Sequence, residues 1–80
     1  MNGHSPDPID LHVGAQLRTR RKALAMSQET LADALGVTFQ QLQKYERAQN
    51  RVSASMLWRA ACKLGCRIGE FFPVTYEAAE

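Results

Sequence analysis

Long hydrophobic runs are missing from this chain of 80 residues. None approaches the roughly 20 consecutive apolar residues of a membrane-spanning helix. The first residues, Met1 to Pro8, also lack the apolar stretch of a secretion signal. With 45% hydrophobic and 22% charged residues, the composition is typical of a globular domain and not of a disordered chain. We therefore expect one folded domain, located in the cytoplasm.

Cysteine and histidine are scarce, with two residues of each. Cys62 and Cys66 lie four residues apart, but His4 and His12 are far away in the sequence, and a structural zinc site needs about four ligands. Cysteines in a reducing compartment rarely pair. We interpret both as small buried apolar residues, with a redox switch as the less favoured alternative. No Ser/His/Asp or Cys/His set is present, so we expect no metal, no cofactor and no catalysis.

Acidic residues are scarce in the middle of the chain. Residues 11–67 hold all ten Lys and Arg residues but only three acids, an excess of seven positive charges, whereas the whole chain has a net charge of +2. Such an excess suits a polyanionic partner. Soluble helices also carry Lys and Arg on solvated faces, so charge alone leaves nucleic acid and a plain polar surface equally open.

What the chain does contain is a series of helical patterns, each with its own start and stop. Four residues of the kind that cap helix N-termini precede these patterns: Asp10, Ser27, Thr38 and Ser53. The stops are supplied by residues that end helices: Gly36, Gly65 and Pro73. With a last helical turn over residues 68–72, the pattern predicts five short helices and no strand, which is an all-α fold.

The helical pattern divides the chain into three parts. Residues 1–9 carry two prolines, a glycine and no periodicity, which predicts a flexible lead. Residues 10–73 hold every predicted helix and form the domain, and residues 74–80 are expected to fray. A chain of this length leaves no room for a separate effector domain, so no small-molecule effector is expected to bind within it.

Residues 27–47 are the most informative segment. They predict two short helices joined at Gly36, the second of which exposes amide and ammonium groups on one side and buries Leu42 and Tyr45 on the other. A short helix with this outer face, braced by a partner helix, is suited to the DNA major groove. The alternative is a polar helix surface that only contacts water.

An ordered series of residues across four predicted helices carries a family resemblance. The series comprises Leu17, Arg18, Arg21, Ser27, Gln28, Leu31, Ala32, Leu35, Gly36, Val37, Gln40, Leu42, Lys44, Tyr45, Glu46, Arg47, Asn50, Arg51, Val52, Ser53, Leu64, Cys66, Phe71 and Phe72. Residues 14–72 thereby resemble the phage-repressor and Cro-like (Xre-type) helix-turn-helix family. The resemblance implies a compact five-helix repressor-like domain whose second and third helices form the helix-turn-helix. It also implies sequence-specific binding to double-stranded DNA, as a homodimer on a palindromic operator.

This resemblance, with side-chain chemistry, assigns roles to residues around the recognition helix, 38–47. Base reading is expected from Phe39, Gln40, Gln43 and Lys44. Gln40 can bond adenine and Lys44 can reach guanine, whereas Phe39 has two equal options, a thymine methyl or the second helix. Phosphate contacts are expected from Arg18, Gln28, Thr38, Gln41, Asn50, Arg51 and Ser53.

Two structural expectations also come from the resemblance. Arg21 and Glu46 occupy positions that the family uses for an ion pair between the first and third helices, so a partly buried pair is implied. Many members have glycine directly after the Glu-Arg pair, where this chain has Ala48. A left-handed residue is therefore expected at Gln49 or Asn50 instead.

Three aromatic residues supply more apolar surface than so small a core requires: Trp58, Phe71 and Phe72. Core packing and a homodimer contact are the two interpretations. The competing function is an antitoxin-like or adaptor module whose main partner is another protein, held by these aromatic residues. RNA binding is a weaker alternative, because the sequence lacks the surface aromatics that stack unpaired bases.

Overall fold

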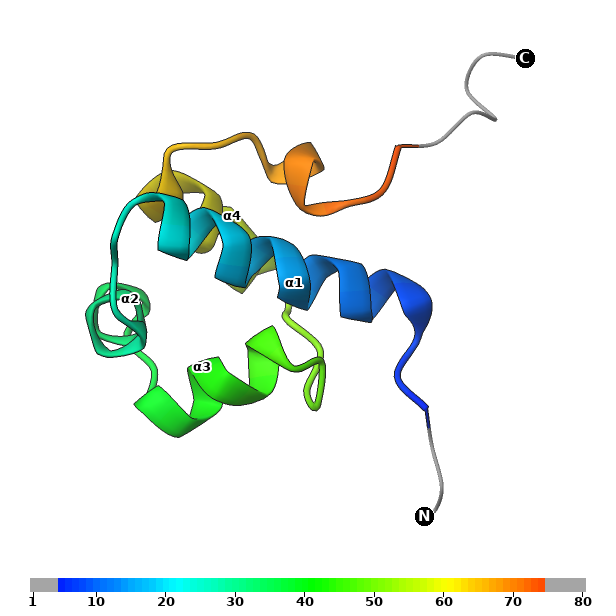
Figure 1. Cartoon of the computed structure of the whole chain (residues 1–80), viewed down its shortest axis with the longest axis horizontal. Coiled ribbons are helices and arrows are strands. Elements are labelled where there is room, and N and C mark those ends of the chain that lie inside the picture. Colours follow the sequence, from blue (N-terminus) through cyan, green and yellow to red (C-terminus); the bar gives the residue numbers. More distant parts are fainter. Residues whose placement is uncertain (1–4, 75–80) are drawn as a thin grey trace.

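The computed structural model describes residues 5–74 and confirms the all-α prediction (Figure 1). Its helices are α1 (Pro8–Ala23), α2 (Gln28–Leu35), α3 (Phe39–Glu46), α4 (Ala54–Leu64) and the 3-10 helix η1 (Ile68–Phe71). α1 crosses the middle of the molecule, with α3 on one side and η1 on the other. α2 contacts both α3 and α4, so it closes the bundle at the end opposite the start of α1.

Within the described residues there are four α-helices, and the predicted fifth helix is the four-residue 3-10 helix η1. Pro73 follows closely, so the chain cannot extend this turn into an α-helix. Glu70 accepts a hydrogen bond from the backbone N–H of Arg67 at 3.0 Å, which fixes the start of the turn. Phe71 is fully buried and anchors η1 to the core.

α1 begins earlier than the sequence indicated. The side chain of Asp7 accepts a hydrogen bond from the N–H of Ile9 at 2.7 Å, and Pro8 follows at a position where its missing N–H is harmless. The prediction that Asp10 caps this helix is wrong, because Asp10 lies inside the first turn. Of the predicted lead and tail, residues 1–4 and 75–80 lie outside the described residues.

The core draws on all five helices. Its buried apolar residues are Val13, Leu17, Leu31, Ala32, Leu35, Leu42, Leu57, Ala60, Ala61, Leu64 and Phe71. Ala34, on another side of α2, is exposed. The buried stripe of α2 runs through Leu31, Ala32 and Leu35 because that side of the helix meets both α3 and α4. Burial of this stripe fixes α2 as the partner that braces α3.

α1 and α3 approach most closely at Gly14. A Cβ atom at this position would lie 2.6 Å from the carbonyl oxygen of Tyr45 and 2.7 Å from that of Glu46. Because both neighbours are backbone atoms, they cannot move aside as a flexible side chain would. Glycine therefore permits the crossing and brings the C-terminal half of α3 against α1.

Each described α-helix is followed by a residue in the left-handed backbone conformation. Gly36 and Gly65 supply it after α2 and α4, whereas Ala25 (φ 56°) and Ala48 (φ 59°) supply it after α1 and α3. After α3, Ala48 donates its N–H to the Tyr45 carbonyl and the next N–H reaches that of Lys44. The expectation of Gln49 or Asn50 as the left-handed residue is therefore wrong.

Candidate nucleic-acid interface

The outer side of α3 carries two exposed polar side chains one helical turn apart. Gln40 and Lys44 are exposed, while Leu42 on the opposite side is fully buried. The helix starts at Thr38, whose hydroxyl oxygen accepts a hydrogen bond from the N–H of Gln41 at 3.0 Å. Leu42 and Thr38 therefore fix the helix, whereas Gln40 and Lys44 are available to a ligand.

Arg47 extends this exposed side beyond the last turn of α3. It follows Lys44 by three residues and Gln40 by seven, the spacing that keeps side chains on one side of a helix. The Arg47 side chain is exposed and has no ion-pair partner among the described residues. No role was predicted for Arg47 from its sequence, although its interval of seven residues from Gln40 is a signal that could have identified it.

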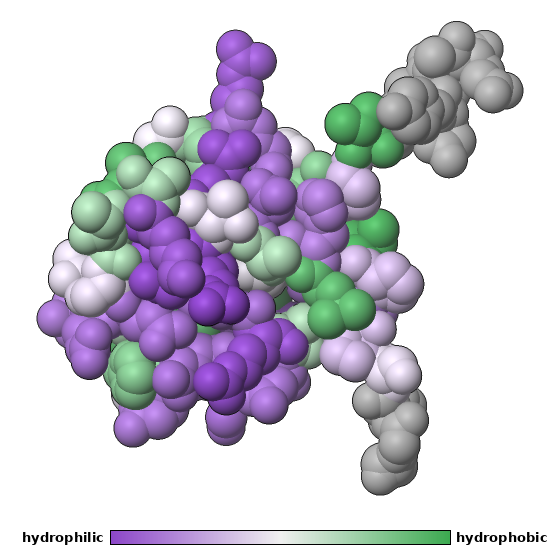
Figure 2. Space-filling model, viewed as in Figure 1, coloured by the Kyte–Doolittle hydropathy of each residue, from purple (hydrophilic) through white to green (hydrophobic). Residues whose placement is uncertain are grey.

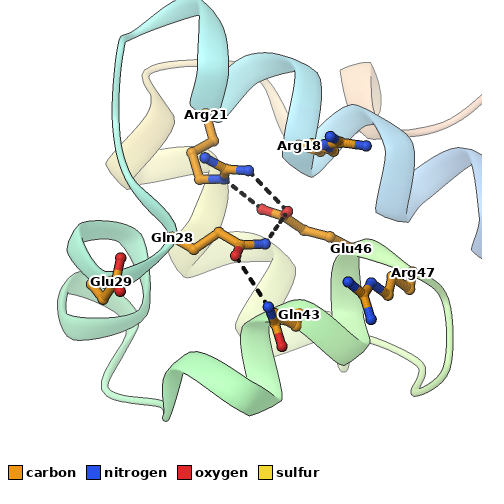
Figure 3. A pocket seen from close by; sticks show the side chains of 7 residues that line it. All are labelled: Arg18, Arg21, Gln28, Glu29, Gln43, Glu46 and Arg47. Atoms are coloured by element: carbon orange, nitrogen blue, oxygen red, sulfur yellow. Dashed lines mark hydrogen bonds and ion pairs between the residues drawn. The ribbon is translucent and has the colours of Figure 1, made fainter.

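Behind this surface, Arg21 of α1 and Glu46 of α3 form a buried, two-pronged ion pair (Figure 3). The Nε of Arg21 lies 2.7 Å from Oε2 of Glu46, and its Nη2 lies 3.1 Å from Oε1. The third nitrogen, Nη1, donates to the carbonyl oxygen of Met26 at 2.8 Å. The side chains are 8% and 2% exposed, so this pair ties α3 to α1 out of contact with water.

Gln28, the first residue of α2, joins the same network (Figure 3). Its Nε2 donates to Oε1 of Glu46 at 2.9 Å, and its Oε1 lies 3.5 Å from Nε2 of Gln43, a long contact. Gln28 thereby joins the start of α2 to the later part of α3, and Gln43 turns toward Gln28.

A polar pocket of about 360 Å³ lies between α1, α2 and α3. Its lining residues are Arg18, Arg21, Gln28, Glu29, Gln43, Glu46 and Arg47. Arg18 and Arg47 lie on either side of Glu46, and neither has an ion-pair partner in the described part of the chain. Figure 2 shows hydrophilic side chains covering the middle of this face. This lining suits an anionic group better than an apolar ligand.

The remaining residues with predicted phosphate roles lie around the ends of α3 and α4. Asn50 and Arg51 are exposed in the loop between these helices, and exposed Ser53 caps α4 by accepting a hydrogen bond from the N–H of Met56 at 3.1 Å. Arg51 is not free: its Nε lies 2.8 Å from Oδ2 of Asp10. This hydrogen bond to the carboxylate raises the pKa of the Arg51 guanidinium.

The three aromatic residues proposed for a dimer contact separate in the structure. Phe71 is fully buried, so its assignment to a contact surface is wrong: it packs in the core. Trp58 is 63% exposed on α4, and Phe72 is also exposed. Neighbouring residues of one turn can differ in this way because η1 has only one side against the core.

The two cysteines also differ from expectation. Cys62 is exposed on α4, so the prediction that both are buried is wrong, whereas Cys66 is partly buried beside the core. Burial raises the pKa of the Cys66 thiol, which disfavours its reactive thiolate form.

The described helices are all too short or too polar to cross a lipid bilayer.

Comparison with known proteins identifies the family. Residues 17–71 match the model of a helix-turn-helix family. An uncharacterized HTH-type transcriptional regulator of Sinorhizobium medicae is 51% identical over 71 residues, which cover 89% of this chain and 51% of that protein. The chain thus spans about half the length of the first curated relatives that it matches.

Several solved structures share the fold, among them two DNA-related regulators by name. The restriction-modification controller protein C.AhdI from Aeromonas hydrophila has a TM-score of 0.73 and 34% identity, covering 78% of this chain and 94% of that one. SinR, solved in complex with DNA, has a TM-score of 0.69 over 74% of this chain and 95% of that one. Its 23% identity limits the likeness to the fold. Together, the matched helices and the sequence identity show that this chain belongs to the Cro/C1-type (Xre-type) helix-turn-helix family of transcriptional regulators.

Proposed function

We propose that this chain binds double-stranded DNA in a sequence-specific manner, with the outer side of α3 in the major groove. The observation that carries the proposal is the exposure of Gln40 and Lys44 one turn apart, on a helix whose other side is fixed to α1 and α2. Gln40 has the paired donor and acceptor that match adenine N6 and N7, and Lys44 can reach guanine O6 or N7.

Phe39 and Gln43 have secondary roles in this proposal. Both are half-buried, so each offers only part of its side chain to a base. Phe39 can still reach a thymine methyl at the start of the helix. Gln43 contacts Gln28, which favours a role in positioning the interface over direct contact with a base.

Phosphate contacts surround this base-reading centre and set the orientation of the domain on the duplex. We assign them to the exposed or half-buried polar residues at its edge: Arg18, Gln28, Thr38, Gln41, Arg47, Asn50, Arg51 and Ser53. Thr38 uses its hydroxyl oxygen as an acceptor in a helix cap, which leaves its O–H free to donate to a phosphate. The Ser53 hydroxyl caps α4 and also lies 3.2 Å from the hydroxyl of Ser55, so the two serines form a pair at the edge of this surface. Gln28 adds the free N–H groups at the start of α2.

We further propose that two copies act together on a palindromic operator. One module of this size binds weakly, since non-specific affinities lie near ~10⁻⁴–10⁻⁶ M, and two modules about 34 Å apart can read both half-sites. Trp58, exposed on α4, supplies an apolar anchor for the second copy. In this proposal the chain acts by binding alone and catalyses no reaction.

Base reading is tested by selecting duplexes from a random pool and then measuring binding with Gln40→Ala, Lys44→Ala and Arg47→Ala. Gln40→Ala should relax the preference at one base position and weaken binding by about 1–3 kcal/mol. Arg47→Ala should weaken all sequences alike and reduce the slope of log affinity against log salt by about one.

Arg59→Ala is the matched control, because it removes the same charge from the exposed surface of α4, outside the proposed interface. The proposal is wrong if the three interface variants keep the affinity and the base preference of the parent chain. Capture of a stoichiometric protein partner, with no selected duplex bound, would instead support the adaptor function.

A further inference from the structure

Arg51 lies in the loop between α3 and α4 and is held by a residue from the other end of the chain. Its Nε donates to Oδ2 of Asp10, in the first turn of α1, at 2.8 Å. The Arg51 side chain is 79% exposed and that of Asp10 is 26% exposed. The two residues are 41 positions apart in the sequence, so the contact exists only because the α3–α4 loop passes the start of α1.

The contact uses one edge of the guanidinium group. Of the three nitrogens in the Arg51 guanidinium, Nε has a hydrogen-bond partner among the described residues, whereas Nη1 and Nη2 have none there. A guanidinium carries five N–H donors in a rigid plane, so four remain available. Two of these, one on Nη1 and one on Nη2, point in parallel and form the fork that matches two oxygens of one phosphate group.

Asp10 is well placed to direct this fork. It belongs to a helix whose start is fixed by the Asp7 cap, and it lines a pocket of about 250 Å³ together with the buried residues Val13 and Leu57. Arg51, by contrast, belongs to a segment without regular secondary structure. A carboxylate on a rigid helix therefore restricts a long side chain that would otherwise sample many rotamers.

We propose that Asp10 is a positioning residue for DNA binding: it holds Arg51 by Nε so that Nη1 and Nη2 grip one phosphate of the duplex. This inference rests on the proposed function. Asp10 itself does not touch the DNA, and its negative charge is offset by the hydrogen bond that it accepts from the guanidinium. The gain is that Arg51 is ordered before DNA arrives.

The test is a double-mutant cycle on a duplex selected by the parent chain, with binding followed by fluorescence anisotropy at several salt concentrations. Asp10→Ala should weaken binding about threefold to tenfold, the range expected when one ordered long side chain is released. Asp10→Asn keeps an oxygen acceptor for Nε and should restore most of that loss. In an Arg51→Ala background, Asp10→Ala should have no further effect.

Asp33→Ala is the matched control, because it removes one exposed carboxylate from α2 without touching Arg51. Tighter binding by Asp10→Ala in both backgrounds would overturn the inference and make Asp10 a simple source of repulsion. Failure of Asp10→Asn to recover binding would also overturn it. If the parent chain selects no duplex, the proposed function is wrong and the inference about Asp10 is wrong with it. If the parent chain binds its duplex but the double-mutant cycle shows no coupling between Asp10 and Arg51, only the inference about Asp10 is wrong.

Discussion

Two alanines, Ala25 and Ala48, occupy backbone positions that favour glycine. Both have φ near +60° and both terminate a helix. The left-handed conformation costs a residue with a Cβ atom roughly 1–2 kcal/mol. Glycine avoids that cost but loses more conformational entropy on folding, by roughly 0.5–1 kcal/mol relative to alanine. The strain is larger than the entropy difference, so glycine at either position would stabilise the fold slightly.

We expect Ala48→Gly to raise the free energy of unfolding by about 0.5–1 kcal/mol, because the strain at φ 59° is relieved. Urea unfolding followed by circular dichroism measures the change. The matched control is Ala15→Gly, an exposed position inside α1, which should lose about 1 kcal/mol. Equal losses in both variants would show that the left-handed backbone at Ala48 is not strained.

Single residues at helix starts were predictable where the signal is local. Ser27, Thr38 and Ser53 each cap a helix as expected, because a side-chain oxygen next to three free N–H groups has few competing partners. Asp10 was the exception. Asp7, Pro8 and Asp10 all suit a helix start, but Asp7 directly precedes a proline, whose fixed φ favours the first position of a helix.

Among the helices, the angle of α3 is set by two kinds of contact. Gly14 permits close approach to α1, and the Arg21–Glu46 pair then locks the crossing, with Gln28 as a third partner from α2. A buried ion pair adds little net stability compared with apolar packing, because both charges lose their water. Its value here is that it specifies one orientation of the helix that carries Gln40 and Lys44.

We expect Glu46→Ala to destabilise the fold by about 3–5 kcal/mol, because it leaves the Arg21 guanidinium buried without its carboxylate. The double variant Arg21→Met with Glu46→Leu should recover most of that loss in urea unfolding. Glu29→Ala, an exposed carboxylate on α2, should change stability by less than about 0.5 kcal/mol. A double variant no more stable than Glu46→Ala would argue that the hydrogen bonds of Gln28 and Met26 matter more than the stranded charge.

Across the whole molecule, the polar surface around the pocket and the exposed apolar side chain of Trp58 lie on different elements. Hydrophilic side chains cover the middle of the face seen in Figure 2, where the pocket with Arg18 and Arg47 lies. Trp58 projects from α4, which contributes no residue to that pocket. This separation would allow one surface to contact DNA while the other contacts a second copy.

The proposed dimer is tested by Trp58→Ala. We expect the variant to shift the chain toward monomer in sedimentation velocity, because it removes an indole that is 63% exposed in the single chain. Binding to a duplex with two half-sites should weaken more than binding to one half-site. Arg59→Ala, the adjacent exposed residue, is the control and should leave the assembly unchanged. A parent chain that stays monomeric on a two-site duplex would contradict the dimer.

The sequence by itself determined the order of the helices, three of the four α-helix caps, the glycine stops and the family, because these depend on hydrogen bonds and apolar spacing among residues within a few positions of one another. Only the tertiary structure decided which side chains meet. It paired Arg51 with Asp10, turned Gln43 toward Gln28, and buried Phe71 while exposing Phe72. Contacts between residues 15 to 41 positions apart follow from how the helices cross, and a close approach such as that at Gly14 leaves no periodic mark in the sequence.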